Sequence, residues 1–458
     1  MIRIAPPLTL VLALATSATA APSHPLLSQI AGQVSPAEQR ATIARLVAFG
    51  TRQTLSDTKS ETRGIGAARR WVKARFEAMS RDCDGCLEVA TPSEVMIGER
   101  LTGPTEVMDV LAIQRGTSDP GRVVVISGHL DSRVSDPMNA TSDAPGANDD
   151  GSGVAAVLES ARVLSRHKFA ATIVYAVDSG EEQGLYGATV LAHYAKAQGW
   201  KVEADLNNDI IGNIHGQSGV IDATHVRVFS EGTKAVETPE QADRRRYNGG
   251  EVDSPSRNLA RFIDGLATDY LKGFSVRMVY RTDRYSRGGD QVRMLEAGYP
   301  AVRITEAAEN YTRQHQDVRT EGGIAYGDVI SGVDFPYLAQ VTRLNAISLA
   351  ALASAPAPPD AVKIEGAVSA DTKVSWAASP GAGSYRVWWR DTTAPRWEHS
   401  RPAGDATSLT LKDVVIDDWF FGVSAVSKDG WESPIEFPGP AGRLCSQRGA
   451  VVSRHHTR

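Results

Sequence analysis

The stretch Arg122-Val-Val-Val-Ile-Ser-Gly-His-Leu-Asp-Ser132 decides the fold class of this chain. Its first half, Arg122 to Ser127, is a short run of β-branched residues, as expected for a strand that is buried on both faces. A second run of this kind extends from Thr172 to Val177. Between the two, the segment from Gly153 to Arg166 places its apolar residues on one face of a helix. The order strand, helix, strand predicts a β-α-β unit with parallel strands.

The alternation of helices and strands continues on both sides of this unit. Residues 23–88 predict mostly helices. The whole pattern favours an α/β fold with a mostly parallel central sheet. In such a sheet, functional side chains gather in the loops after the carboxyl ends of the strands. The further predicted elements are helices at Gly187–Gln198, Asn258–Lys272 and Asp334–Ala353, and strands at Ala204–Ile211 and Ala301–Thr305.

The character of the sequence changes after Ala353. Residues 354–360 are small and rich in proline, which is typical of a linker. Short β-rich segments separated by turns then predict a small all-β sandwich over residues 361–443. The polar tail, residues 444–458, is expected to be disordered. The predicted strands of the sandwich are Lys373–Ala377, Ser384–Trp389, Ser408–Leu411 and Phe420–Val426.

Residues 1–20 predict an export signal. Arg3 supplies a positive charge, an apolar stretch runs from Leu8 to Ala15, and Ala18-Thr-Ala20 is a small-x-small cleavage site. The alternative, a membrane anchor, is disfavoured because the apolar stretch is too short to span a bilayer. We therefore expect a periplasmic or secreted protein whose large domain spans residues 21–353.

Charge and cysteine content narrow the function classes. The chain has 49 basic and 54 acidic side chains, a formal net charge of −5, which gives no sign of a nucleic-acid partner or of membrane binding. Its three cysteines are Cys83 and Cys86, in a Cys-Asp-Gly-Cys motif, and Cys445. In an exported chain the pair is expected to form a small structural disulfide. A zinc site at the pair would need two more ligands, and only Cys445 could add a thiolate.

Several short motifs carry side chains that can bind metal. His129 and Asp131 follow the first buried strand, where alternate side chains point the same way. Such a pair suits an imidazole that binds metal and is oriented by a carboxylate. Asp149 lies in a glycine-rich stretch before a helix, where Asp150 or Ser152 alone would be enough to cap that helix. Asp149 is therefore left for another role.

Two further carboxylates, Glu181 and Glu182, follow the second buried strand. A metal-dependent hydrolase needs one carboxylate as a ligand and another as the general base. Asp209 lies within a predicted apolar strand, and buried aspartates are rare unless they are paired or bind metal. His315 lies in a loop after the strand Ala301–Thr305.

Each motif alone has an ordinary alternative, such as a solvated loop, a helix cap or a strand-end turn. Together, however, they place two histidines and several carboxylates after successive strands, where the chemistry of an α/β sheet is expected. Nitrogen and oxygen ligands without sulfur suit Zn²⁺ or Mn²⁺. The sequence therefore predicts a catalytic metal site at this edge of the sheet.

The order of these motifs resembles the M28 family of zinc peptidases, which includes bacterial leucyl aminopeptidases and glutamate carboxypeptidases. The motifs are His-x-Asp, Gly-Ala-Asn-Asp-Asp-Gly-Ser-Gly, Glu-Glu-x-Gly, Asn-Asp and a late His, and the resemblance covers Phe49 to Ala353. It implies a three-layer α/β/α zinc exopeptidase fold with two Zn²⁺ ions per chain. It also implies that Glu181 is the general base and that Asp131 orients a ligand. The implied ligands are His129 and Asp209 for one ion, Glu182 and His315 for the other, and Asp149 for both.

One position departs from the family pattern. Asp290 is followed by Gln291, where the family often has a histidine near the substrate pocket. That position is not a metal ligand in the family, so the departure concerns substrate preference.

The C-terminal segment resembles a fibronectin type III domain through Trp419-x-Phe-x-Val-x-Ala425 and the turn Lys428–Ser433. Exposed aromatic side chains on it are a candidate contact for a polymer or a partner protein, although such residues more often belong to the core.

The sequence favours a monomeric metal-dependent aminopeptidase that acts on peptides. The main alternative is a carboxypeptidase or dipeptidase of the same fold, which would need a cation aimed at the substrate carboxylate. A glutaminyl cyclase is disfavoured because such relatives work with one zinc ion, and an inactive binding protein because the ligand set and Glu181 are complete. The candidate cations for a substrate carboxylate are Arg281, Arg284, Arg287 and Arg313.

Overall fold

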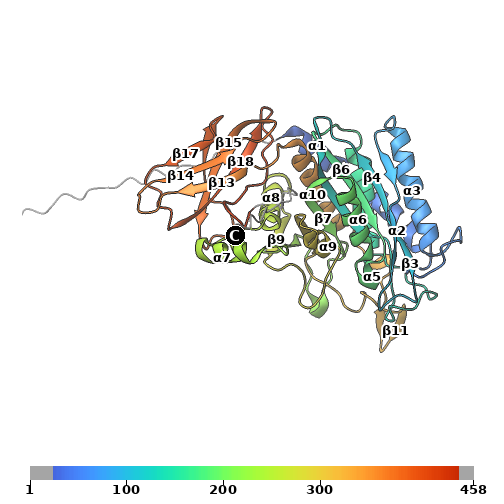
Figure 1. Ribbon diagram of the computed structural model, residues 1–458. Helices are drawn as coiled ribbons and strands as arrows, with labels where there is room; N and C mark the ends of the chain where they lie inside the picture. The colour runs from blue at the N-terminus through green and yellow to red at the C-terminus, as the bar shows by residue number, and fades with distance from the viewer. Residues whose placement is uncertain (1–23, 443–458) are drawn as a thin grey trace, which may run out of the picture.

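The computed structural model describes residues 24–442, which form a large layered part and a smaller β-rich part (Figure 1). The predicted export signal, the polar tail and Cys445 lie outside these residues. Within residues 24–442, no helix combines the length and the apolar character needed to cross a membrane.

An eight-stranded sheet forms the centre of the layered part. Its strands are β1 (Glu88–Ala90), β4 (Val110–Gln114), β5 (Asp119–His129), β6 (Ala171–Asp178), β7 (Lys201–Asn208), β8 (His225–Phe229), β9 (Ser275–Val279) and β10 (Ala301–Glu306). They lie in the order β1-β4-β6-β5-β7-β10-β8-β9. The four neighbours β6, β5, β7 and β10 are parallel, whereas β4 and β8 run antiparallel to this group. The predicted, mostly parallel sheet is confirmed.

Helices cover both faces of the sheet and make the part three-layered (Figure 1). The alternation along β5 explains the two cores, because Val124 and Ile126 pack in one and Val123 and Val125 in the other. The helices on the first face are α1 (Pro25–Gln33), α2 (Pro36–Val47), α3 (Gly64–Asp82), α4 (Gly151–Leu164), α8 (Pro255–Tyr270) and α10 (Phe335–Ser354). Those on the other face are α6 (Tyr186–Ala197) and α9 (Gln291–Glu296).

Shorter elements lie around this core. The helix α5 (Glu181–Gly184) directly precedes α6, and α7 (Pro239–Asn248) begins with a capping box at Thr238. Two hairpins belong to the layered part: β2 (Ser93–Met96) with β3 (Thr105–Met108), and β11 (Arg319–Glu321) with β12 (Ile324–Tyr326).

The strand predictions hold, with one difference that matters for the site. The predicted strands Arg122–Ser127, Thr172–Val177 and Ala301–Thr305 lie within β5, β6 and β10. The predicted strand Ala204–Ile211 is wrong at its end, because β7 stops at Asn208. Ile210 has a φ of 60°, which turns the chain away from the extended direction. Asp209 therefore lies just past the strand.

The C-terminal part is a sandwich of two three-stranded antiparallel sheets, as predicted. One sheet contains β13 (Asp360–Glu365), β14 (Thr372–Ala377) and β17 (Ser408–Leu411). The other contains β15 (Ala382–Asp391), β16 (His399–Gly404) and β18 (Trp419–Ser427). Every Trp, Tyr and Phe of residues 361–442 is buried or partly buried, which favours the packing role of these side chains over an exposed contact surface. Five of them, Trp376, Tyr385, Trp389, Trp419 and Phe421, belong to or pack against the core between the two sheets.

Buried charges join the two parts. Arg390 of β15 and Asp253 before α8 are both fully buried, and Arg390 Nη2 lies 2.7 and 2.9 Å from the two carboxylate oxygens. Arg261 Nη1 contacts the same carboxylate at 2.9 Å. The ring of His24 also stacks on Trp431 at a centroid distance of 3.8 Å. The sandwich is therefore packed against the layered part through specific polar contacts.

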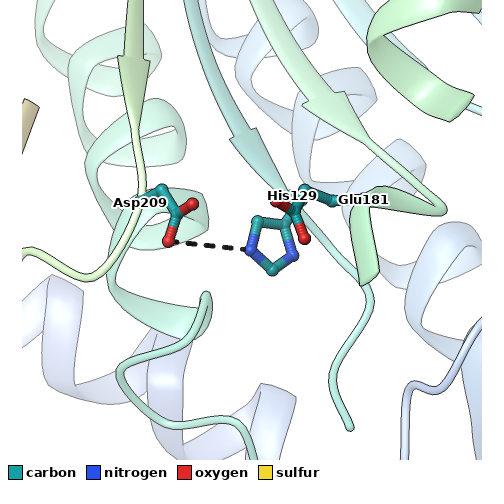
Figure 2. A group of neighbouring side chains, drawn as sticks. All are labelled: His129, Glu181 and Asp209. Carbon is teal, nitrogen blue, oxygen red and sulfur yellow. Dashed lines mark ion pairs between the residues drawn. The ribbon is translucent and has the colours of Figure 1, made fainter. Parts of the chain in front are cut away.

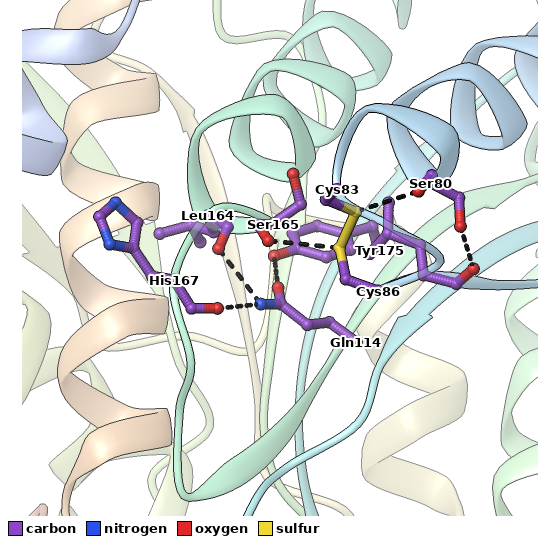
Figure 3. Close-up of a disulfide and its surroundings, with 9 residues drawn as sticks. Ser80, Cys83, Cys86, Gln114, Leu164, Ser165, His167 and Tyr175 are labelled. Atoms are coloured by element: carbon purple, nitrogen blue, oxygen red, sulfur yellow. Dashed lines mark hydrogen bonds between the residues drawn. A yellow bond between two sulfur atoms is a disulfide. The ribbon is translucent and has the colours of Figure 1, made fainter.

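The Cys83–Cys86 disulfide predicted from the sequence is formed (Figure 3). It closes the turn at the end of α3 and lies beside the loop that follows α4, where Cys86 Sγ is 3.2 Å from the carbonyl oxygen of Ser165. It therefore stabilises the junction of two helices.

Candidate metal centre

The predicted site residues meet at the carboxyl ends of the parallel strands. His129 is the last residue of β5, and Glu181 and Glu182 open α5 after β6. Asp209 follows β7 directly, and His315 lies in the loop after β10. Because β6, β5, β7 and β10 are neighbours, their ends bring these side chains together although they are far apart in the sequence.

Two groups of side chains could each hold a metal ion. The first contains His129, Glu181 and Asp209, and the second contains Asp149, Glu182 and His315. In each group the candidate ligand atoms lie within 4.8 Å of one another. Figure 2 shows the first group, with His129 Nε2 3.9 Å from Asp209 Oδ1.

Asp149 lies between the two groups. Its Oδ1 is 3.2 Å from Nε2 of His129, and its Oδ2 is 2.9 Å from Nε2 of His315. Nε2 of His315 also lies 3.1 Å from Glu182 Oε1. One oxygen of Asp149 thus faces each histidine, which is the arrangement a bridging carboxylate needs.

Buried polar atoms of the site test whether it fits metal ions. His129 Nε2, Glu182 Oε1 and Asp209 Oδ1 are buried, and within residues 24–442 they have ion-pair neighbours from the site itself but no hydrogen bond of good geometry. Buried polar atoms normally form such hydrogen bonds, so several of them lacking one in one place need an explanation. Imidazole nitrogens and carboxylate oxygens are the donors that a catalytic zinc ion uses. The residues present therefore fit divalent cations.

Asp131 supports the site differently from what its spacing predicted. The carbonyl oxygen of Asp131, rather than its carboxylate, lies nearest to His129 Nδ1, at 3.1 Å against 3.6 Å. The carboxylate accepts the backbone N–H groups of Glu181 at 3.2 Å and Glu182 at 3.0 Å. Thr54 donates its hydroxyl to the same carboxylate. Asp131 therefore fixes both the imidazole and the start of α5.

Neighbouring charges strongly shift the pKa values of the ligands. Burial alone would lower the pKa of His315, but Glu182 and Asp149 raise it to about 10. Burial would likewise lower the pKa of His129, but the nearby carboxylates of Asp131 and Asp149 raise it well above its ordinary value. Without metal, a pKa of about 10 keeps the imidazole of His315 protonated at neutral pH. A metal ion has to displace this proton in order to bind.

Glu181 differs from its neighbour in its surroundings. It is partly exposed, whereas Glu182 is only 4% exposed. Desolvation raises the pKa of Glu181 well above its ordinary value, and the negative charges of Glu182 and Asp209 raise it further. A carboxylate with a raised pKa at the mouth of a site is suited to accept and return a proton.

Several residues that the sequence did not single out hold the ligand loops. Arg52 is fully buried and donates to the carbonyl oxygens of Leu130, Pro145 and Gly146. Asp328 accepts the backbone N–H of Asp149 at 2.7 Å. No spacing rule points to either residue, because their partners are far away in the sequence.

Asp150 acts as the helix cap that the sequence predicted, and it does more. Its Oδ1 accepts the backbone N–H of Gly153 in the first turn of α4 at 2.9 Å. Its Oδ2 accepts the N–H of His129 at 3.0 Å. The cap of α4 is thereby tied to the end of β5.

A buried arginine contacts the ligand Asp209. Arg303 of β10 is fully buried and forms an ion pair with Asp209 Oδ2. Burial would lower the pKa of Arg303, but Asp209 and Asp283 raise it above its ordinary value. A charged residue inside the predicted strand Ala301–Thr305 was a signal in the sequence that could have identified it.

The predicted role of Gln291 near the substrate is not what the structure shows. Its side chain is fully buried and donates to Asp283 Oδ2 at 2.6 Å. It therefore lies beneath the site, in the same network as Arg303, and does not face open space.

The four candidate arginines for a substrate carboxylate are mostly engaged. Arg284 and Arg287 both contact Glu309, at 3.4 and 3.0 Å. Arg313 donates to Asn213 Oδ1 at 2.8 Å and to a backbone carbonyl. Arg281 is exposed and lies 5.4 Å from the ring centroid of Tyr285.

Known proteins with similar sequences are described as peptidases or zinc metalloproteases. The family model described as peptidase family M28 matches residues 109–321. A probable zinc metalloprotease from Pyrenophora tritici-repentis is 43% identical, over 90% of this chain and 87% of its own length. A probable zinc metalloprotease from Leptosphaeria maculans is also 43% identical, over 89% of this chain and 95% of its own length.

Solved structures are similar in fold. The Legionella pneumophila aminopeptidase LapA has a TM-score of 0.52 and 20% identity, covering 72% of this chain and 75% of its own. LapB from Legionella pneumophila has a TM-score of 0.51 and 19% identity, covering 71% of this chain and 74% of its own. At these identities the similarity concerns the fold.

Proposed function

Because this chain belongs to peptidase family M28 and is a metallopeptidase, we propose that it is a two-zinc aminopeptidase that removes residues from the N-terminus of peptides. The observation that carries the proposal is the position of Asp149, with one oxygen toward each of two histidines. Each histidine has a second carboxylate nearby, Asp209 for His129 and Glu182 for His315. Two ions that share one carboxylate account for all five side chains.

The proposed roles follow from the positions of the side chains. Asp149, His129 and Asp209 would hold one ion, and Asp149, Glu182 and His315 the other. Bound Zn²⁺ ions would polarise the scissile carbonyl, acidify the attacking water and bind the free amine of the substrate. Glu181 takes the proton of the attacking water and gives it to the leaving nitrogen. Asp131 keeps Glu181 in place by accepting its backbone N–H.

The surroundings of the site favour the N-terminus over the C-terminus of a substrate. A carboxypeptidase needs a cation that is free to bind the terminal carboxylate. Three of the four candidate arginines already contact protein groups, and Arg281 lies over Tyr285 on the exposed surface. A substrate carboxylate would have to displace these existing partners.

The proposal extends to export and domain organisation. The N-terminal sequence supports removal of residues 1–20, and the Cys83–Cys86 disulfide suits an oxidising compartment. We propose a catalytic domain over residues 21–353, a linker at 354–360 and a fibronectin type III-like sandwich over 361–443, in a monomeric protein. The sandwich assignment is supported by two separate three-stranded sheets, one of β13, β14 and β17 and the other of β15, β16 and β18.

A panel of amino acid p-nitroanilides, with and without an N-terminal acetyl group, tests the proposed activity. We expect cleavage of the free-amine substrates alone, and loss of activity when a chelator removes the metal. Cleavage of acetylated substrates at the same rate would contradict an aminopeptidase. If the panel is not cleaved while metal is bound, peptides with free C-termini become the substrates to test.

The variant Glu181→Gln tests the proposed general base on the same panel. We expect kcat to fall by about 10²–10⁴-fold, because the amide cannot accept the proton of the attacking water. The variant should still contain two zinc ions, measured by elemental analysis, because Glu181 is not one of the five proposed ligands. Unchanged kcat would exclude Glu181 as the base, and loss of zinc would make it a ligand.

A further inference from the structure

We propose that Arg303 is a positioning residue that holds Asp209 so that only its Oδ1 can bind a metal ion. The inference rests on the proposed two-zinc function and concerns the ion held by His129 and Asp209. It also assigns a role to Gly289, Asp283 and Gln291, which keep Arg303 in place.

The contacts of Asp209 divide its two carboxylate oxygens. Oδ2 forms an ion pair with Arg303 Nη1, and Arg284 Nη2 lies 3.9 Å from the same oxygen. Oδ1 lies 3.9 Å from Nε2 of His129 and, within the described part of the chain, has no hydrogen-bond partner. An arginine on one oxygen leaves the other as the only atom that can turn toward a metal ion.

The position of Arg303 in the sheet explains how it reaches this carboxylate. Arg303 is in β10, directly opposite Asn207 of the parallel strand β7. Asp209 lies two residues beyond Asn207, just after β7 ends, so the long arginine side chain spans the remaining distance. Its Nη2 also lies 3.5 Å from the backbone carbonyl oxygen of Asp209. A fully buried guanidinium is costly unless carboxylates surround it, so its presence in a central strand calls for a specific function.

A second layer of contacts holds the arginine. Asp283 Oδ2 lies 3.7 Å from Arg303 Nη1 and accepts a hydrogen bond from Gln291 at 2.6 Å. Gly289 leaves room for the guanidinium, because a Cβ at this position would lie 2.4 Å from Arg303 Nη1. The departure from the family pattern at Gln291 thus belongs to the support of a metal ligand.

The other proposed ion lacks an equivalent contact. Among residues 24–442, the arginine nearest to the carboxylate of Glu182 is Arg133, with its Nη1 3.9 Å from Oε2. Arg133 also donates to the carbonyl oxygens of Val134 and Ser135. Loss of Arg303 should therefore weaken the binding of one ion and leave the binding of the other nearly unchanged. General destabilisation of the protein would not produce this asymmetry.

The test measures zinc binding to the full chain by competition with a chromophoric chelator. We expect Arg303→Met to bind one Zn²⁺ ion with wild-type affinity and the other about 10–100-fold more weakly, the usual effect of removing a partner of a metal ligand. Arg303→Lys keeps the charge but not the planar geometry, and we expect an intermediate loss. The absorption spectrum of the Co²⁺-substituted protein reports the geometry of each ion independently of activity.

Two further variants separate positioning from stability. Gly289→Ala pushes on the arginine without changing the sheet, and we expect it to weaken the same ion as Arg303→Met. It also provides a test if Arg303→Met fails to fold. Arg122→Met removes an equally buried arginine at the other end of the sheet, where it pairs with Glu203. This control is expected to lower the melting temperature while leaving both zinc affinities unchanged.

The outcomes distinguish the inference from the proposed function. If Arg303→Met and Gly289→Ala bind two ions as tightly as the wild type, or if either binds zinc more tightly, Arg303 does not position Asp209. Equal weakening of both ions would also overturn the inference, whereas the two-zinc function would stand. A wild-type protein that binds fewer than two zinc ions would overturn both.

Discussion

Asp149 and His315 show how single residues set the chemistry of the site. Asp149 is far from the loop of His315 in the sequence, yet Gln314, next to His315, donates to the carboxylate of Asp149 across 165 positions. His315 Nε2 lies 2.9 Å from Asp149 Oδ2, so in the absence of metal the two ligands form an ion pair with each other. At the scale of residues, metal binding and proton binding therefore compete for the same atoms.

This competition gives a prediction about proton release. The folded pKa of His315 is raised to about 10, so the stability that its charged form contributes is fully present below about 6.5 and is lost as the pH rises through about 10. Zinc binds the neutral imidazole, so zinc added to the chelator-treated protein at pH 7.5 should release protons. Calorimetric titrations in buffers of different ionisation enthalpy measure the number of protons released per chain. The His315→Gln variant should release about one proton fewer per chain, and zinc uptake without proton release would contradict the prediction.

At the scale of elements, β7 carries an unusual buried acid. Asp205 is fully buried in the middle of the sheet and accepts the hydroxyl of Ser127 on β5 at 2.9 Å. Desolvation raises the pKa of Asp205 to about 7. The strand thus contains an ionisable group that favours the neutral state when folded.

We therefore predict a pH-dependent effect of Asp205→Asn. The folded pKa lies above the unfolded one, so the stability linked to the neutral acid is fully present below about 4 and is lost as the pH rises through about 7. Asparagine cannot ionise, so the stability of the variant relative to wild type should rise by about 3 kcal/mol between pH 5 and pH 8. Urea unfolding of the wild type and the variant at pH 5 and at pH 8 measures the difference in their free energies of unfolding. A difference that does not change with pH would show that Asp205 does not titrate in this range.

The disulfide at the end of α3 gives a second prediction at this scale. Cys83 and Cys86 close a very short loop, so the loop-entropy contribution is about 2 kcal/mol or less. The double variant Cys83→Ser, Cys86→Ser should lose about this much stability in chemical denaturation. Because the disulfide lies beside the loop after α4, away from the carboxyl ends of the strands, kcat should not change. A large loss of activity would show that the α3 junction is coupled to the site.

At the scale of the whole molecule, a buried ion pair links the sandwich to the layered part. We predict that Arg390→Met destabilises the protein by about 3 kcal/mol, because Asp253 stays buried and, among residues 24–442, keeps only Arg261 as an ion-pair partner. Lys412→Met removes an exposed pair with Asp371 inside the sandwich and should destabilise the protein much less than Arg390→Met. Thermal unfolding compares the two variants. An equal loss of stability in the two variants would show that the buried Arg390–Asp253 pair stabilises the protein no more than the exposed pair does.

The sequence by itself determined the fold class and the proposed ligand set. Buried parallel strands leave continuous β-branched runs such as Val123–Ile126, and a helix leaves its periodicity, because both signals are local. The motifs that contain His129, Asp149, Glu182, Asp209 and His315 could be read from their positions after predicted strands, and the resemblance to the M28 family implied that these residues are the ligands.

Only the tertiary structure decided which groups support those ligands. Asp131 binds the backbone of α5, Gln291 is buried beneath the site, and Arg303 pairs with Asp209. The Arg390–Asp253 pair likewise joins segments that are 137 residues apart. These contacts depend on which strands become neighbours and on where side chains end in space. Local spacing does not encode such distances, because they are set by the packing of the whole chain.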